Sequence, residues 1–455
     1  MKSWQGGQSL PLMVMFVVVL SAAFIFLFNT GQLLATRMRL SAVSDHVAYS
    51  VATEEARLLN LNAYLNRASI ANQLAVAQDV SLASWAAFTQ PIPQRASVLL
   101  APPMTPVGVV VEQGSVTLAS AMKPIGESME AFILQNQLAN ELIRLHQQEI
   151  NLLYYRYLIN QVPMSILDSA RMRGDGVDVG LLSTTDILPM FLEDHKGRKR
   201  GRLVEVMSAS REPFTRGRVR WNKNFGLMKC NQLLPNAPYF ELVKRGGTDL
   251  LGMDAWKGMD TFSMHMYVGY WRLNDLAIPK WTCKHKEYPV GYGSALMAIN
   301  KMDPDNQSGA LFDGSWRANR QASRVSRTSR MTWDSRSGIK AKSPAVPEFF
   351  DIAQSKIKSN KREMAVTVSV FQRKDDIVIT SGRSELMTGR TLSQYDGLPG
   401  GGVSARSRAM VYFERPYDKY LNNGKMEVAN LFNPYWRVRL DRLTNADRQA
   451  LVVSL

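Results

Sequence analysis

The most regular feature of the chain is an unbroken apolar block near its start. Residues 10–28 contain no charged side chain, and Ser21 is the polar residue within them. A helix rises about 1.5 Å per residue, so a helical block of this length matches the hydrocarbon core of a bilayer. The pattern predicts a short lead followed by a membrane-spanning helix within residues 1–31.

Two other interpretations of this block compete with a retained membrane anchor. A cleaved secretory signal needs small residues at its cleavage site, and Phe26-Leu27-Phe28-Asn29 has no such pattern. A buried core helix usually has a polar face, which this block lacks. Small residues in a membrane helix also allow a neighbouring helix to approach closely. We therefore expect a retained anchor, formed by Leu12, Val18, Ser21, Ala22, Ala23 and Phe28.

The helical pattern extends well beyond the apolar block. No proline occurs between Pro11 and Pro91, and residues 32–89 are rich in alanine, leucine, glutamine and arginine, which favour or tolerate helix. We expect one long helix ending near Thr89, with a kink or local flexibility at Gly31. One face of it carries Leu58, Leu61, Leu65, Ala68 and Ala75, with Asn60, Asn62, Asn66 and Asn72 close by.

A second helix follows after a proline-rich connection between Pro91 and Pro106. We expect it to start near Pro124 and to end at Pro163. Its apolar residues repeat with the spacing of a helix seam, at Leu138, Leu142, Leu145, Leu152 and Ile159. This seam predicts antiparallel packing against the first helix, so that residues 32–170 form a helical hairpin stalk.

From residue 171 onward, short segments separated by glycine, proline and aromatic residues predict a separate mixed domain over residues 171–455. Apolar and polar residues alternate in its clearest strands. These are residues 365–372 and 376–381. Further strand candidates are residues 409–414 and 435–440, and a last helix capped by Asn445 should cover residues 445–453. Residues 319–343 combine basic residues with serines and predict an exposed basic loop. The predicted fold class is α+β, with antiparallel strands.

The composition suits a membrane anchor with one or two folded domains, since 45% of the 455 residues are hydrophobic. Lysine and arginine total 55 against 39 acidic residues, a net charge of +16 that predicts attraction to a polyanion. The two cysteines, Cys230 and Cys283, are too few for a zinc site. They are consistent with one disulfide in an oxidising compartment, although two buried free thiols explain the same count.

No group of residues in the sequence indicates catalysis. Ser120 and Lys123 match an S-x-x-K arrangement, but the companion S-D-N and K-T-G elements are missing. The five histidines lack the spacing of zinc ligands, and the segment that begins at Asp303 lacks the glycine and glutamate of a calcium loop. We expect no enzymatic activity, no metal and no cofactor.

Two basic segments could hold a polyanion, and their central residues are Arg198, Lys199, Arg200, Arg324, Arg327 and Arg330. A solubilising basic surface that faces anionic lipid or envelope polymer explains these residues without any specificity. Nucleic acid is the less favoured partner of an exported, membrane-anchored chain, because non-specific positive charge is the one sequence feature that indicates nucleic-acid binding.

The N-terminal region also carries a recognisable arrangement of residues around its apolar block: Gly7, Pro11, Gly31, Arg39-Leu40 and Ala42-Val43-Ser44-Asp45-His46-Val47-Ala48. This arrangement resembles the TadE/TadG-type N-terminal region of tight-adherence (Flp) pilus assembly proteins, over about the first tenth of the chain. Leu12 stands where type IV pilins and some Tad pseudopilins carry glutamate after the processing glycine. The uncleaved, anchored TadG-like form is therefore the closer match.

The resemblance implies a bacterial inner-membrane protein with a periplasmic C-terminal domain. Charge counting leaves this orientation open, because Lys2 precedes the apolar block while Arg37 and Arg39 follow it. We expect a non-enzymatic component of Tad/Flp pilus assembly, either TadG-like or a minor pilin-like subunit incorporated in the pilus. Its expected partners are other pilus-assembly or pilin-like subunits, with oligomerisation through the N-terminal helix. The alternative is a membrane-anchored protein whose basic domain captures a polyanion.

Overall fold

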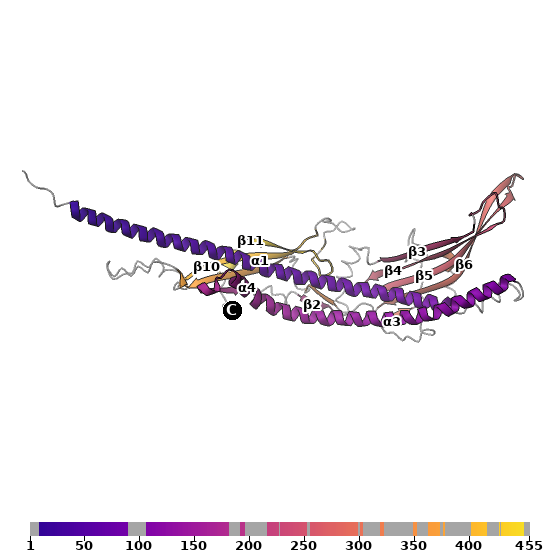
Figure 1. The fold of residues 1–455 in the computed structure, drawn as a ribbon, viewed down its shortest axis with the longest axis horizontal. Coiled ribbons are helices and arrows are strands. Elements are labelled where there is room, and N and C mark those ends of the chain that lie inside the picture. Colours follow the sequence, from indigo (N-terminus) through magenta and orange to yellow (C-terminus); the bar gives the residue numbers. More distant parts are fainter. Residues whose placement is uncertain are drawn as a thin grey trace, which may run out of the picture.

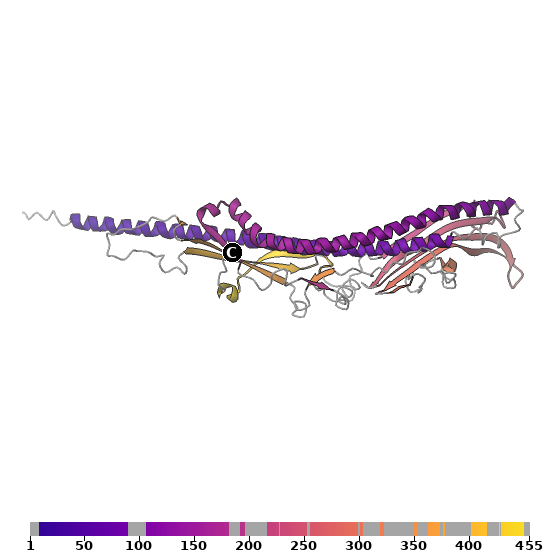
Figure 2. The same ribbon diagram turned by 90° about the horizontal axis from the view of Figure 1, so that it is seen from below.

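The chain folds as an α+β protein with a long N-terminal apolar helix and antiparallel sheets, which confirms the predicted fold class at this level. In this computed structural model the molecule is elongated, and the N-terminal part of the long helix extends alone beyond the sheets (Figure 1). Figure 2 shows the sheets on one side of the helices. The structure describes residues 9–89, 106–181, 192–195, 216–226, 228–252, 255–298, 301–303, 319–322, 349–352, 363–373, 376–377, 402–415, 427 and 429–449.

The first helix, α1 (Ser9–Thr89), confirms the predicted long helix and its end. Its 81 residues correspond to about 120 Å of α-helix. The helix continues through Gly31, where a kink was expected. Continuity there is supported by Thr30, whose hydroxyl donates to the carbonyl of Phe26 at 2.8 Å, one turn earlier.

The second long helix, α3 (Pro106–Arg156), starts earlier than the sequence indicated. The expected start at Pro124 is wrong, because Pro124 lies inside the helix. Pro106, which we assigned to the extended connection, occupies the first turn, where the missing N–H of proline costs no helical hydrogen bond. Residues 90–105, the rest of the expected connection, lie outside the described residues.

The expected helix end at Pro163 is also wrong. A π-helical turn, η1 (Tyr157–Gln161), links α3 directly to α4 (Val162–Ser169), and Pro163 lies in the first turn of α4. In the first turn of a helix, the N–H group that proline lacks would have no helical acceptor, so the helical path continues through Pro163. A short 3₁₀ turn, η2 (Arg173–Asp175), then leads into the first strand.

The two long helices pack against each other in antiparallel directions. Residues later in α1 contact residues earlier in α3. Many of their contacts are polar, and the hydrogen-bonded pairs include Asn62 with Asn151 at 2.8 Å, Asn66 with Gln147 at 2.9 Å, and Asn72 with Asn140 at 3.2 Å. The leucine seam that we expected at this interface does not form it. Leu138, Leu142, Leu145 and Leu152 are each more than half exposed.

A four-stranded antiparallel sheet packs against the middle of α1. Its strands, in spatial order, are β1 (Val177–Leu181), β9 (Glu363–Arg373), β10 (Gly402–Phe413) and β11 (Trp436–Asp441). The shared core joins apolar residues of α1 and α4 to the sheet, and among them are Val47, Val51, Leu59, Leu167, Val368, Val370 and Val411. This hydrophobic core fixes the sheet to the helix just beyond the apolar block.

Three of the four predicted strands fall within this sheet. Residues 365–372 lie in β9, residues 409–413 in β10 and residues 436–440 in β11. The expected strand at 376–381 is not formed at Asp376 and Ile377, and its remaining residues lie outside the described part of the chain. Asp376 instead sits beside the left-handed turn at Gly176, where a Cβ would meet its carboxylate.

A second antiparallel sheet accompanies the far end of α1, with its strands in consecutive order. The strands are β3 (Arg216–Phe225), β4 (Pro238–Gly252), β5 (Ala255–Leu273), β6 (Pro279–Ala298) and β7 (Lys301–Asp303). Between the two sheets, β2 (Leu192–His195) pairs with β8 (Phe349–Ile352). None of these strands was predicted individually. Glycines and charged residues interrupt their apolar alternation.

The last helix, α10 (Asn445–Gln449), starts where the sequence predicted, and residues 450–453 lie outside the described residues. Its cap is Thr444 and not Asn445, which corrects the predicted cap. The Asp447 N–H donates to the Thr444 hydroxyl at 3.2 Å, and the Thr444 N–H donates to the Asp447 carboxylate at 2.9 Å. This reciprocal pair satisfies two backbone donors at the helix start.

Candidate functional site

The N-terminal end of α1 presents a bare apolar surface. Large hydrophobic side chains from Leu10 to Phe28 are between 41% and 74% exposed, and no other described element covers them. Within the described residues α1 is the one helix long and apolar enough to cross a membrane. Exposing this much hydrocarbon to water is unfavourable, so the segment needs an apolar environment.

The predicted anchor residues all lie on this segment. Leu12 is 74% exposed, Val18 44% and Phe28 48%, and Ser21, Ala22 and Ala23 are exposed as well. The Ser21 hydroxyl donates to the Val17 carbonyl at 2.8 Å, so its one polar group is satisfied inside the helix. A serine bonded in this way is compatible with a lipid environment, because it leaves no unpaired donor.

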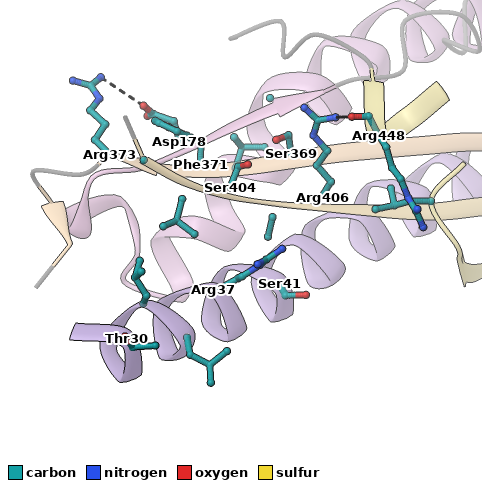
Figure 3. A pocket seen from close by; sticks show the side chains of 18 residues that line it. Thr30, Arg37, Ser41, Asp178, Ser369, Phe371, Arg373, Ser404, Arg406 and Arg448 are labelled. Carbon is teal, nitrogen blue, oxygen red and sulfur yellow. Dashed lines mark hydrogen bonds and ion pairs between the residues drawn. The ribbon is translucent and has the colours of Figure 1, made fainter. Parts of the chain in front are cut away.

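A groove of about 1100 Å³ lies where the apolar segment ends (Figure 3). One wall is α1 from Thr30 to Ser41, and the other wall is formed by β1, β9 and β10 together with Leu443 and with Arg448 of α10. Four arginines and one aspartate line it, namely Arg37, Arg373, Arg406, Arg448 and Asp178. The groove therefore carries a net positive charge.

The arginines of the groove differ in what they contact. Arg373 pairs with Asp178 at 3.6 Å, and both side chains are well exposed. Arg406 donates from Nη1 to the carbonyls of Asp447 at 2.9 Å and Arg448 at 2.7 Å, and so ties β10 to the last helix. Sequence reasoning missed this cluster. Its arginines come from four segments far apart in the chain, so no local pattern could have revealed it.

The outer face of α3 forms a second apolar surface, which we call the leucine stripe. It consists of Leu134, Leu138, Leu142, Leu145 and Leu152, which are between 54% and 62% exposed. Each of these side chains is three, four or seven residues from the next, so they line one helical face. The side chain of Ile159, which we placed in the same seam, is outside the described part of the structure.

The far sheet carries the two cysteines. Cys230 follows β3, Cys283 lies in β6, and the two form a disulfide with their Cα atoms 5.6 Å apart. On the neighbouring strands β5 and β6, His265 and His285 stack with their ring nitrogens 2.7 Å apart. Burial, together with the neighbouring His265, lowers the pKa of His285.

The S-x-x-K motif considered for chemistry lies on α3. The Ser120 hydroxyl donates to the carbonyl of Thr117 at 2.9 Å on an exposed face of α3. No group of three or more histidine, cysteine, aspartate or glutamate side chains among the described residues is arranged to hold a metal.

The predicted polyanion-binding residues Arg198, Lys199, Arg200, Arg324, Arg327 and Arg330 lie outside the described residues, as does the basic loop from residue 323 onward. At residues 319–322 the expected exposed loop is wrong, because Asn319 and Ala322 are buried and residues 320–322 are helical. In comparisons with known proteins, no family model, curated protein or solved structure matches this chain. Its function therefore has to be argued from its own residues.

Proposed function

We propose that this chain is a single-pass inner-membrane component of a Tad/Flp-type pilus assembly system, TadG-like or minor pilin-like, and that it acts through protein contacts. Residues 10–28 hold it in the bilayer, and the remainder projects into the periplasm as a helical stalk with attached sheets. The observation that carries this proposal is the fully exposed apolar end of α1, which continues without a break into the folded part of the molecule.

Three further features support the proposal. The arrangement from Gly7 to Ala48 resembles the TadE/TadG-type N-terminal region. The disulfide between Cys230 and Cys283 suits an oxidising compartment such as the periplasm. The consecutive small residues Ser21 and Ala22 allow another membrane helix to approach closely, as lateral assembly with other subunits requires.

The leucine stripe supplies a second contact surface outside the membrane. The five leucines are still more than half exposed in the isolated chain, and each would contribute about 1–1.5 kcal/mol if a partner covered the remainder. We propose that its occupant is an amphipathic helix of another pilus-assembly subunit anchored in the same membrane. Two such stems held side by side in one bilayer would present their helices to each other along most of their length.

The experiment that tests this function replaces leucines of the stripe in the full-length chain. The L142E/L145E variant should lose at least tenfold of its co-purification with other subunits from detergent-solubilised membranes, because two carboxylates would be buried at the contact. N224E/Q232E is the matched control, since it adds the same charges at exposed polar positions on and beside β3, away from the leucine stripe, and should leave the complexes intact. Unchanged co-purification by the L142E/L145E variant would contradict the proposal.

A further inference from the structure

We propose that the far end of the second sheet inserts into an anionic phospholipid surface other than the bilayer that holds residues 10–28. The inference concerns residues 271–280, which we call the hairpin tip. They comprise the end of β5, the turn that follows it and the start of β6. The inference rests on the proposed function in one respect, because the position of the tip is counted from an anchor at residues 10–28.

The strand β5 runs in the same direction along the molecule as α1. Gln78 of α1 donates a hydrogen bond to Asp260 of β5. Farther along both elements, the ring of Trp85 lies 6.2 Å from the ring of Phe262. Since α1 leads away from residues 10–28, β5 leads away from them as well. Figure 1 and Figure 2 show this end of the sheet beyond the last turn of α1.

The hairpin tip is therefore far from the anchor. Between Phe28 and Trp85, α1 covers about 85 Å at about 1.5 Å per residue. Between Phe262 and Leu273, β5 covers about 36 Å more along its own path, at about 3.3 Å per residue. A whole bilayer with its headgroups is about 40–45 Å thick. The tip cannot reach the bilayer that holds the anchor, so any lipid it meets belongs to another surface.

The hairpin tip exposes large apolar side chains at its very end. Leu273, Leu276 and Ile278 are 63%, 77% and 57% exposed. Trp271, farther from the end, is 54% exposed and packs edge-on against Trp281, with ring centroids 5.2 Å apart. Tryptophan is enriched at membrane–water interfaces, where its ring lies at headgroup level. Aliphatic side chains at the end and tryptophan behind them suit insertion of the tip into a bilayer interface.

The backbone of the turn is already hydrogen-bonded within the tip. The side-chain oxygen of Asn274 accepts from the N–H groups of Leu276 at 3.0 Å and Ile278 at 2.8 Å. The Asn274 N–H donates to the Ile278 carbonyl at 3.0 Å, and the Ala277 N–H donates to the Asn274 carbonyl at 3.0 Å. Backbone groups without partners are costly in an apolar medium. The turn can leave water without losing these hydrogen bonds.

Contacts with the loop between β3 and β4 hold the base of the hairpin tip. The disulfide joins Cys230 of this loop to Cys283 of β6. The Trp281 indole N–H donates to the Cys230 carbonyl at 3.1 Å, and the Asn236 N–H donates to the Gly269 carbonyl at 2.8 Å. These contacts fasten both strands of the hairpin just behind the tip, so the apolar end projects from a fixed base.

The charges of the hairpin tip favour an anionic surface. Arg272 and Lys280 lie directly opposite each other on β5 and β6, both are exposed, and neither makes an ion pair among the described residues. Like charges placed opposite each other in a sheet repel, and lipid phosphates would neutralise both. Long basic side chains can keep their charge at headgroup level while neighbouring apolar side chains enter the hydrocarbon. Asp275 is the one acidic residue of the tip.

The size of the hairpin tip favours lipid over a protein partner. A specific protein interface takes about 20–30 residues on each side, and the tip supplies no more than half of that number. A second copy of the tip would bring four like charges together, which is unfavourable. An anionic bilayer requires a small apolar wedge flanked by cations, and the tip supplies both.

The test uses the full-length chain, inserted through residues 10–28 into phosphatidylcholine nanodiscs, and measures whether these nanodiscs float with separate vesicles. We expect flotation with vesicles of phosphatidylcholine and phosphatidylglycerol, and at least about tenfold less with phosphatidylcholine alone. L276S/I278S should weaken binding to the anionic vesicles by at least about tenfold, because two apolar side chains no longer enter the hydrocarbon. L153S/L440S is the matched control, since both leucines are exposed but lie on α3 and β11.

The charge of the hairpin tip is tested with separate variants. R272Q/K280Q should bind the anionic vesicles roughly 25-fold more weakly, about fivefold for each charge removed. D275N should bind them about fivefold more tightly, because it removes a carboxylate that the lipid phosphates repel. R156Q/R442Q is the matched control, because both side chains are exposed away from the tip and its binding should equal that of the wild type.

Wild-type nanodiscs that float with neither kind of vesicle would overturn the inference and leave the tip to a protein partner. Equal flotation with both kinds would overturn the assignment to an anionic surface, as would unchanged binding by L276S/I278S or R272Q/K280Q. The proposed function is tested by co-purification through the leucine stripe of α3, which lies outside the hairpin tip. The two proposals can therefore fail separately.

Discussion

Asparagines of α1 hold the other elements in place at the scale of single residues. Asn60 exchanges two hydrogen bonds with the backbone of Trp436, each 3.0 Å long, at the start of β11. Asn66 donates to the carbonyls of Phe350 at 2.8 Å and Leu431 at 2.7 Å, and its side-chain oxygen accepts from Gln147. A single buried side chain therefore connects α1 to α3, to β8 and to the segment before β11.

Replacement of Asn66 by alanine should destabilise the fold strongly. Three hydrogen bonds would be lost, and the Gln147 amide would keep the longer bond to the Asn62 carbonyl at 3.4 Å, at a cost of about 2–4 kcal/mol. The measurement is thermal unfolding of the full-length chain in detergent, where N66A should have a lower midpoint. N224A is the control, because Asn224 is exposed on β3. Equal midpoints for N66A and the wild type would show that these contacts do not hold the elements together.

A second residue-scale prediction concerns Asp260, which is fully buried on β5. Burial raises the pKa of Asp260 to about 6 from an ordinary 3.8, and outweighs both the Lys244 ammonium at 3.5 Å and a hydrogen bond from Gln78. The folded state therefore keeps a proton that the unfolded chain releases. The free energy of unfolding should fall as pH rises from about 4 to about 6, by up to about 3 kcal/mol from this group.

The D260N variant should lack this contribution, because an amide does not titrate. The thermal midpoint of the wild type should therefore fall relative to that of D260N as pH rises from 4 to 7. D275N is the control, since Asp275 is exposed in the turn between β5 and β6 and should keep the wild-type pH profile. A constant difference across this pH range would contradict the buried, protonated state of Asp260.

At the scale of elements, periodicity predicted helices and strands better than it predicted their partners. The length of α1 follows from its composition, and β9, β10 and β11 follow from alternation. The α1–α3 interface does not, because its positions on α3 include Asn140 and Gln147, which hydrophobic periodicity ignores. The leucine stripe, on the opposite face of α3, is more apolar, so hydrophobic periodicity assigns that face to the interface. Hydrogen bonds between polar side chains of α1 and α3 bury the other face instead.

The apolar segment of α1 makes an element-scale prediction about insertion. A V18R substitution places a charge near the centre of residues 10–28 and should cost about 3 kcal/mol of insertion free energy. The fraction of the chain released from membranes by alkaline extraction should rise accordingly. V116R is the control, because Val116 is also exposed but lies on α3, outside the apolar block. Equal membrane retention of V18R and V116R would contradict the assignment of this segment.

At the scale of the whole molecule, the sequence indicates the anchor but not the groove beside it. A long apolar helical segment is a local property of consecutive residues and can be predicted directly. The groove needs Arg37, Arg373, Arg406 and Arg448 to meet, and they meet because the four-stranded sheet packs on α1 just beyond the apolar block. That meeting depends on long-range packing, which periodicity does not encode.

The net charge of +16 gives a whole-molecule prediction that separates the proposed function from polyanion capture. Binding to DNA through six or more phosphate contacts would weaken by roughly 1,000-fold between 50 and 200 mM salt. Contacts through the leucine stripe and the membrane helix should change little over the same range, because apolar burial depends weakly on salt. Co-purification of other subunits and retention on immobilised DNA, measured side by side, distinguish the two functions. Salt-sensitive DNA retention without co-purifying subunits would favour polyanion capture.

The central claim is that residues 10–28 remain attached and lodged in lipid while the rest of the chain projects outward. Its most direct test is intact mass spectrometry of the wild-type product in the membrane and soluble fractions after alkaline carbonate extraction. We expect the chain in the membrane pellet, with a mass that still includes residues 10–28. Recovery from the soluble fraction, or a mass that lacks this segment, would contradict the account.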